Sequence, residues 1–308
     1  MRRERNHFTS VTSDPVTITS FKAAPTISWN DGNDLSGVFG QLSIPLAASG
    51  IDGSFAYESS QSGVVDASQD PPAVVSAGSA TLTATFTPDE ADLYQSTTAT
   101  LAVTVQKATP TIDWSDVTGT FGEATITAPT ASVAGAFTYS TEDADIIDVT
   151  QDPPAILRAG ETTITATFTP AASGNYEVTS STIEVAISEA TPAVSWSDVS
   201  QTFGAGSLSA PTADVPGTFV YTTEDPAIVD VSENPPAIVG VGTTTITATF
   251  TPRQSRRYTT VTLDPITVEI SARPVTLKAS DQTITSGNDP SRLFTVASGS
   301  LAVGDDID

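Results

Sequence analysis

The sequence has no cysteine, one histidine and one methionine among its 308 residues. A chain without cysteine folds without disulfide chemistry. The only histidine, His7, lies near the N-terminus, so no catalytic triad or histidine-rich metal site is available in the repeats described below. Neither a glycine-rich phosphate loop nor a nucleophile motif is present. These absences predict that the chain is not an enzyme and carries no cofactor.

Basic residues are also scarce, with 12 lysines and arginines against 36 aspartates and glutamates and a net charge of −24. Such acidity repels nucleic acids and anionic membrane surfaces, so neither is expected as a partner. No apolar run approaches the roughly 18 to 20 residues of a membrane span, so no membrane insertion is expected. An apolar content of 38% is nevertheless too high for a disordered acidic chain. The composition therefore favours folded, acidic domains.

One nonapeptide occurs three times with little change, as Ala80–Pro88, Thr162–Pro170 and Thr244–Pro252. Its phenylalanines, Phe86, Phe168 and Phe250, are separated by 82 residues. Apolar residues alternate with threonines along it, which is typical of a strand with one buried and one solvated face. A fixed period of this length indicates tandem repeats.

Other landmarks recur in the same order, including a tryptophan, a Phe-Gly pair, a Pro-Pro-Ala segment and a tyrosine after the nonapeptide. They divide the chain into three full repeats flanked by two incomplete segments. We expect residues 1–24 to be the C-terminal strand of a preceding repeat. The remaining predicted boundaries are 25–108, 109–190 and 191–272 for the full repeats and 273–308 for a truncated final domain.

Seven short strands separated by glycine, proline and aspartate turns are expected in each repeat, and no segment shows the apolar period of a helix. This pattern predicts an all-β fold of tandem immunoglobulin-like β-sandwiches. Short linkers that each contain proline favour stiff connections and hence an elongated rod. In the second repeat the predicted strands are Thr111–Trp114, Ala124–Thr127, Phe137–Thr141, Ile146–Val149, Ala155–Leu157, Thr162–Thr169 and Glu177–Ile187.

These repeats resemble bacterial Ig-like (Big-type) domains in the segment PTIDW near the start, in GAFTYS, in TTITATFTP and in an aromatic such as Tyr176 about eight residues later. The segment from Val275 to Asp306 resembles the start of an MBG domain of the YGX type, with Ser286 in place of the tyrosine of that family. Such domains occur in large bacterial surface and secreted proteins, often adhesins, mainly as stalks. The resemblance implies a location and a context, and it implies no chemistry.

Calcium is the metal worth considering, because hard cations prefer oxygen ligands. Asn30–Asp34 groups oxygen-bearing side chains around a glycine, and acidic residues recur near the end of each domain, where a bound cation would stiffen a junction. Solvated acidic loops are the alternative interpretation. The calcium candidates are Asp31, Asn33, Asp34, Glu142, Asp143, Asp145, Asp148, Glu224, Asp225 and Asp230.

Aromatic and basic residues supply the remaining candidates. Trp29, Trp114 and Trp196 are candidate sugar-stacking platforms, but their place in an alternating first strand favours a core role. Tyr94, Tyr176 and Tyr258 are expected to pack rather than to bind a ligand. The cluster Arg253, Arg256 and Arg257 occurs only in the third repeat, and we interpret it as a variable loop or as a docking point for an acidic neighbour or an anionic glycan.

The sequence as a whole predicts a structural spacer in a large extracellular bacterial surface or adhesin-like protein. The alternative is an adhesion module in which one repeat binds a glycan or a protein. The basic N-terminus lacks the apolar region of a secretory signal, so export would depend on a signal outside this segment. The incomplete ends, 1–24 and 273–308, would expose unpaired strand edges and are expected to pair with another chain or to be poorly ordered.

Overall fold

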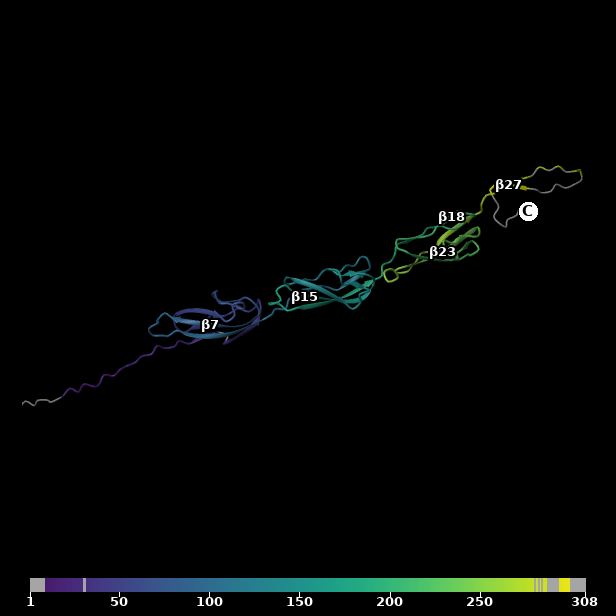
Figure 1. Cartoon of the computed structure of the whole chain (residues 1–308). Coiled ribbons are helices and arrows are strands. Elements are labelled where there is room, and N and C mark those ends of the chain that lie inside the picture. The colour runs from purple at the N-terminus through teal and green to yellow at the C-terminus, as the bar shows by residue number, and fades with distance from the viewer. Residues whose placement is uncertain are drawn as a thin grey trace, which may run out of the picture. The chain divides into compact units, whose positions relative to one another are not determined.

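The computed structural model describes residues 9–29, 32–279, 281, 283, 285–286 and 294–299. Every regular element in this part of the chain is a β-strand, and Figure 1 shows strands and connecting loops throughout. The chain divides into two compact units, the first formed by Met1–Asp113, Thr130–Thr138 and Thr167–Ser180. The second unit is formed by Trp114–Pro129, Tyr139–Ala166 and Ser181–Asp308. The repeat boundaries given above stay predictions.

The same series of strands occurs in each of the three repeats, except that the last strand is divided into two in the third. In the first repeat the strands are β1 (Ile27–Trp29), β2 (Asp34–Val38), β3 (Ala47–Ser49), β4 (Gly53–Ser59), β5 (Val65–Asp66), β6 (Ala73–Val74), β7 (Gly78–Pro88) and β8 (Thr97–Gln106). In the second they are β9 (Ile112–Asp113), β10 (Val117–Thr120), β11 (Thr130–Ala131), β12 (Gly135–Thr141), β13 (Ile147–Asp148), β14 (Ala155–Ile156), β15 (Gly160–Pro170) and β16 (Thr179–Ser188). In the third they are β17 (Val194–Ser195), β18 (Val199–Thr202), β19 (Thr212–Ala213), β20 (Gly217–Thr223), β21 (Val229–Asp230), β22 (Ala237–Ile238), β23 (Gly242–Pro252), β24 (Val261–Thr262) and β25 (Ile266–Ser271).

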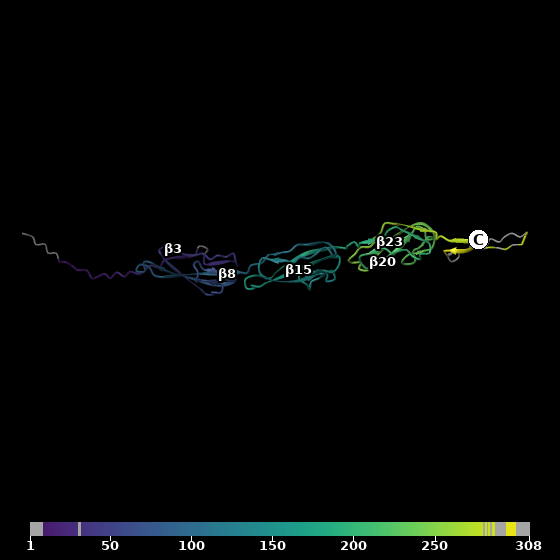
Figure 2. The same ribbon diagram turned by 90° about the horizontal axis from the view of Figure 1, so that it is seen from above.

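Each repeat contains one main sheet and short two-stranded pairs. The main sheets have the strand orders β2-β8-β7-β4, β10-β16-β15-β12 and β18-β25-β23-β20, with β24 pairing to β23 in the third. The outer strands β2, β10 and β18 run parallel to their neighbours. In Figure 2, β20 and β23 lie side by side, in agreement with the antiparallel register that places Phe219 opposite Phe250. This architecture makes the chain an all-β tandem array of immunoglobulin-like β-sandwiches.

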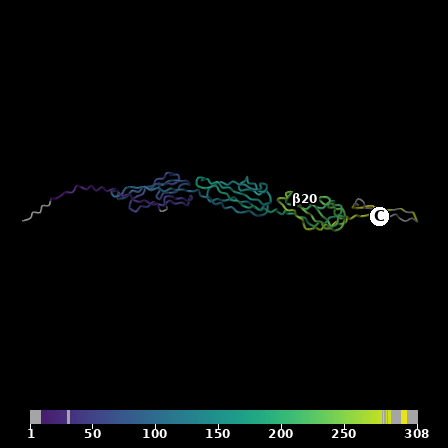
Figure 3. Tube along the Cα trace, turned by 90° about the horizontal axis from the view of Figure 1, so that it is seen from below, coloured from purple at the N-terminus to yellow at the C-terminus, as the bar shows by residue number. Residues whose placement is uncertain are grey.

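The recurring nonapeptide forms most of β7, β15 and β23, each of which is an interior strand of its main sheet. Ile164 and Ala166 are fully buried, and Phe168 is 1% exposed. The intervening threonines are partly exposed or exposed, as the alternating pattern predicts. Figure 3 shows the extended strands and tight turns of the third repeat around β20. The motif is therefore a structural core strand in all three repeats.

A glycine on the neighbouring strand explains why the phenylalanine of the motif fits. Gly53, Gly135 and Gly217 begin β4, β12 and β20, and a Cβ added to any of them would overlap the ring of Phe86, Phe168 or Phe250. The absence of a side chain lets each aromatic ring lie directly against the backbone of the adjacent strand.

One predicted strand is wrong, and two observed strands were not predicted. Ala124–Thr127 is irregular, although Ile126 is buried in the core at 5% exposure. The apolar alternation in this segment reflects the burial of Ile126 and not the pairing of its backbone with another strand. In contrast, β10 and β11 form although their sequences contain few apolar residues, because β10 pairs with β16 and β11 pairs with β9.

The ends of the described chain differ from the repeats. Residues 9–22 form no strand, and Val11, Val16, Ile18 and Phe21 are each more than 80% exposed. Near the C-terminus, β26 (Thr276–Ala279) pairs antiparallel with β27 (Phe294–Ser298). The assignments of residues 1–24 and 273–308 to parts of further domains stay predictions.

Candidate functional site

The basic loop, Arg253–Arg257, immediately follows β23 in the second unit. Two backbone hydrogen bonds close its turn, from the amides of Arg257 and Tyr258 to the carbonyl oxygen of Gln254, at 2.9 and 3.1 Å. The corresponding turn in the second repeat is closed in the same way, with the amides of Asn175 and Tyr176 donating to Ala172. The basic loop therefore has the same turn hydrogen bonds as the uncharged loop at residues 171–175 and differs from it in its side chains.

Arg257 and Arg256 join the basic loop to residues of the preceding repeat. Arg257 Nε donates a hydrogen bond of 2.7 Å to the carbonyl oxygen of Leu157. The Arg257 guanidinium also lies over the ring of Phe121, 5.1 Å from its centroid. The amide of Ala159 donates to the carbonyl oxygen of Arg256 at 2.8 Å. The part of the loop nearest Tyr258 therefore docks on its neighbour through hydrogen bonds and a cation–π contact.

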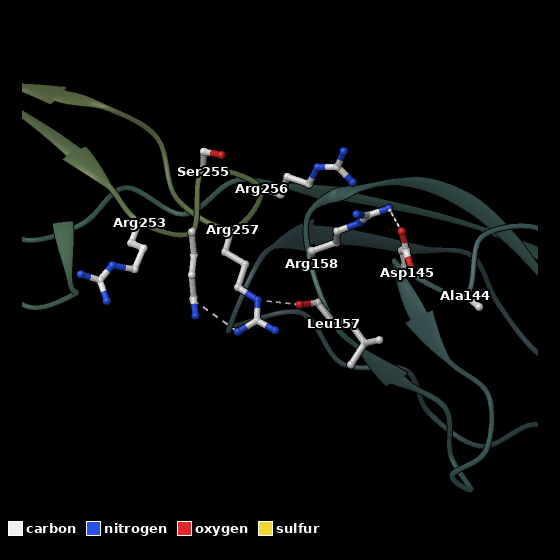
Figure 4. Close-up of a pocket in the computed structure, with 9 residues that line it drawn as sticks. Ala144, Asp145, Leu157, Arg158, Arg253, Ser255, Arg256 and Arg257 are labelled. Carbon is white, nitrogen blue, oxygen red and sulfur yellow. Dashed lines mark hydrogen bonds and ion pairs between the residues drawn. The ribbon is translucent and has the colours of Figure 1, made fainter. Parts of the chain in front are cut away.

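Arg158 and the basic loop line one pocket, and Arg158 makes the ion pairs found in the described part of the chain. Its Nη2 is 3.3 Å from Asp143 Oδ2 and 3.2 Å from Asp145 Oδ2. The Arg158 side chain is 17% exposed. Figure 4 shows Arg158 directed toward Asp145 and Arg257 directed toward Leu157. Arg158 is therefore held in place by two carboxylates, and Arg257 by a backbone carbonyl and an aromatic ring.

A related set of contacts occurs in the first unit at positions 82 residues earlier. The amide of Ala77 donates to Asn175 Oδ1 at 2.9 Å. In the second unit the equivalent amide, that of Ala159, donates to the carbonyl oxygen of Arg256. Asn175 occupies the position of Arg257 in the repeat. The side chain of Asn175 thus accepts a hydrogen bond from a backbone amide of the preceding repeat, whereas the side chain of Arg257 donates one to a backbone carbonyl.

We use the term junction for these contacts between successive repeats. Each junction also includes an alanine of the linker and the tyrosine that follows the turn. Ala108 forms a parallel bridge with Tyr176 in the first unit, and Ala190 forms one with Tyr258 in the second. The ring of Tyr176 meets Phe39 edge-on at 5.6 Å and 88°, and Tyr258 meets Phe121 at 5.8 Å and 82°. The expectation that these tyrosines pack is confirmed for Tyr176 and Tyr258.

Ala23 repeats the backbone part of this arrangement. It bridges to Tyr94, its amide donates to the carbonyl of Leu93 at 3.0 Å, and its carbonyl accepts from the amide of Gln95 at 3.0 Å. Lys22 Nζ donates to the carbonyl of Ala91 at 2.5 Å. The same mode of linker attachment therefore occurs three times in the described chain.

Two of the predicted calcium ligands, Asp143 and Asp225, accept hydrogen bonds from backbone amides of their own turns. Asp143 Oδ1 accepts from the amide of Asp145 at 2.8 Å, and Asp225 Oδ1 accepts from the amide of Ala227 at 2.9 Å. Glu142 and Glu224 are exposed, as are Asn33 and Asp34 at the start of β2, and Asp31 lies outside the described residues. Within the described ranges no group of three or more acidic or histidine side chains is arranged to hold a metal ion. Calcium binding stays a prediction.

Asp148 and Asp230 occupy a second type of turn, together with their counterpart Asp66. In each case the carboxylate accepts the backbone amide two residues later at 2.9 Å. Hydrogen bonds from the side chain and backbone of Ser68, Thr150 or Ser232 lower the pKa of these carboxyls below the ordinary value, with Gln69 and Gln151 contributing in the first two repeats. These aspartates are directed toward their own turns.

Trp29 belongs to the core of its repeat, and Trp114 and Trp196 pack against theirs. Trp29 is 5% exposed, and the indoles of Trp114 and Trp196 donate to the carbonyls of Thr127 and Ser209 at 2.8 and 2.9 Å. Next to Trp114, the hydroxyl of Tyr139 donates to Asp152 Oδ1 at 2.8 Å. Burial, followed by this hydrogen bond and the charge of Asp152, raises the pKa of Tyr139 to about 12. These contacts support the core interpretation of the tryptophans.

Two important residues of the site were not singled out from the sequence. Arg158 is the only basic residue in the second repeat, and that isolation is the signal that was available in the sequence. Asn175 aligns with Arg257 directly before the junction tyrosine. A comparison of this position among the repeats would have identified it as variable.

No family model and no curated protein matches the chain. Among solved structures, the chain is similar to Drosophila N-cadherin EC1-4, with 12% identity, 78% of this chain and 72% of that chain covered, and a TM-score of 0.28. Zebrafish RET cadherin-like domains 1 to 4 match with 10% identity, 72% and 66% coverage and a TM-score of 0.23. Domains 4-9 of the surface layer protein SbsC match with 13% identity, 76% and 42% coverage and a TM-score of 0.24.

At these identities and TM-scores the similarities support no conclusion about function, and the fold class rests on the strands described above. Among the described residues, no helix is long and apolar enough to cross a membrane.

Proposed function

We propose that this chain is a non-enzymatic spacer segment of a large extracellular bacterial surface or adhesin-like protein. The repeats would be Big-type domains followed by the start of an MBG-type domain, as the sequence resemblance implies. In this role the array holds other parts of the protein away from the cell, and its stiffness is the property that matters.

The observation that supports the proposal most is the recurrence of the junction contacts. Ala108, Tyr176 and Phe39 interact in the first unit as Ala190, Tyr258 and Phe121 interact in the second. A linker that is hydrogen-bonded on both sides of one alanine has little freedom to swivel. Repetition of the same attachment suits a mechanical role, because every junction then resists bending in the same way.

Composition agrees with an extracellular setting. The chain has no cysteine to oxidise, and its net charge of −24 opposes self-association. Both properties suit export in an unfolded state followed by folding outside the cell.

Single-molecule pulling of the chain tests the proposal and the domain boundaries together. Three repeats of 82 to 84 residues should unfold in three similar steps, each releasing at most about 270 to 300 Å of extended chain before the folded length is subtracted. One long step, or steps of clearly unequal length, would contradict independent repeats in series.

A further inference from the structure

The pocket between the basic loop and the second repeat concentrates positive charge in a strongly acidic chain. It is an open pocket with a volume of about 620 Å³, and it is lined by Ala144, Asp145, Leu157, Arg158 and the loop Arg253–Arg257. Four of the chain's 12 basic residues therefore surround one pocket, with one aspartate among the lining residues. This local excess of positive charge is opposite in sign to the rest of the molecule.

The four arginines are not equivalent. Arg257 is held by Leu157 and Phe121, and Arg158 is held by Asp143 and Asp145. Arg253 and Arg256 are exposed, and no contact of their guanidinium groups with another described residue is recorded. Two guanidinium groups are therefore free to bind an external anion beside two that are fixed.

From this arrangement we propose that the pocket binds a sulfated polysaccharide. Guanidinium groups present several planar donors that match the oxygens of sulfate and carboxylate groups. Figure 4 shows the Arg253 and Arg256 side chains directed to different sides of the loop, so one small anion cannot contact both. A polymer that carries an anionic group on each of several successive sugars reaches both. The proposal does not depend on the spacer role.

A nucleic acid fits the pocket less well. The lining residues include no aromatic side chain on which a base could stack, and stacking supplies much of the affinity for single strands. Reading of duplex DNA requires a helix or a strand ribbon that enters a groove, whereas this loop presents only side-chain donors.

The net charge of −24 does not prevent binding at physiological salt. The Debye length at 0.15 M ionic strength is about 8 Å, so acidic groups farther away than this contribute little repulsion. Close contacts with Arg253 and Arg256 then dominate, and binding should be lost in about 1 M salt, where the Debye length falls to about 3 Å.

Calorimetric titration of the whole chain with heparin, a sulfated polysaccharide, at 0.15 M salt tests the proposal. The informative variant is R253A/R256G, since the second repeat carries Ala171 and Gly174 at these positions with the same turn hydrogen bonds. Loss of two exposed ionic contacts should weaken binding roughly tenfold. The control K107A/K278A removes the same charge from two exposed lysines elsewhere and should bind like the unchanged chain.

Three results would overturn the proposal: absence of heparin binding by the unchanged chain, equal binding by R253A/R256G, or equal weakening by K107A/K278A. Inorganic sulfate and a single-stranded DNA oligonucleotide serve as competing probes. Comparable affinity for inorganic sulfate would contradict a polymeric ligand, and comparable affinity for the oligonucleotide would contradict the preference for sulfated sugars. Slow amide exchange at Ala159 in R253A/R256G verifies that the loop remains docked in the variant.

Discussion

The guanidinium of Arg257 lies 5.1 Å from the centroid of Phe121 while its Nε donates to the carbonyl oxygen of Leu157 at 2.7 Å. One side chain of the third repeat thus satisfies a backbone acceptor of the second repeat and covers an aromatic ring of it. This contact makes the junction in the second unit a packed interface in place of a free hinge.

Replacing Arg257 with alanine should loosen this junction. The change removes a charge-assisted hydrogen bond worth about 1.5 to 3 kcal/mol and a cation–π contact worth about 0.5 to 1 kcal/mol. The amide of Ala190 donates to the carbonyl oxygen of Arg257, and the amide of Thr259 donates to that of Ala190, so amide exchange at both residues should become faster. R253A is the matched control, because no contact of that guanidinium is recorded, and an equal acceleration in R253A would refute the assignment to Arg257.

The edge-on pair of Phe39 and Tyr176 should contribute measurable coupling in the first unit. Edge-on aromatic pairs add about 0.5 to 1.5 kcal/mol beyond the area that they bury. A double-mutant cycle of F39A and Y176A, monitored by denaturant unfolding, isolates this interaction. The corresponding cycle of F121A and Y258A should give a similar value. Additive effects in both cycles would mean that the rings touch without stabilising the junction.

The three turn aspartates, Asp66, Asp148 and Asp230, should make the fold less stable in acid. Their folded-state pKa values are lowered, so their contribution is present above the unfolded pKa of about 3.9 and is lost as the pH falls through the lower folded value. Between about pH 5 and about pH 2, the melting temperature of D66N/D148N/D230N should therefore depend less on pH than that of the unchanged chain. An unchanged pH dependence in this variant would show that other carboxyls govern the acid transition.

Calcium binding can be tested by comparing the unchanged chain with a variant that lacks Arg158, since Arg158 pairs with two of the predicted calcium ligands. Arg158 already neutralises Asp143 and Asp145, which lowers their value as calcium ligands. A chelator should leave the melting temperature of the unchanged chain unaltered. In R158A the two carboxylates lose their partner, and added calcium should raise the melting temperature of that variant alone. A large chelator effect on the unchanged chain would favour the calcium-stiffened array.

Much of the fold could be predicted from residue spacing. The alternation in Thr162–Pro170 correctly predicts the burial of Ile164, Ala166 and Phe168, because a strand with one buried face has period two. The same rule fails at Ala124–Thr127, where Ile126 is buried without any strand, and at β10, where backbone pairing with β16 decides the structure. Periodicity records side-chain burial and carries no information on which backbones pair.

The candidate site was less predictable, since its contacts join positions that are far apart in the chain. Arg257 meets Leu157 across 100 residues, and Tyr176 meets Phe39 across a repeat boundary. The sequence marked the basic loop as unusual and the tyrosines as packing residues. It could not supply the partners, because each repeat has its own phenylalanine and tyrosine, and the tyrosines of these pairs contact the phenylalanine of the preceding repeat.

Small-angle X-ray scattering of the unchanged chain tests the central claim, that the repeats form a stiff spacer. Three sandwiches in series, each on the order of 30 to 40 Å long, should give a maximum dimension of at least about 100 Å. Salt should have little effect on this dimension, because the linker contacts are mainly backbone hydrogen bonds and aromatic packing. A compact particle with a radius of gyration near 19 Å, about the value for a single globular domain of this chain length, would contradict the account.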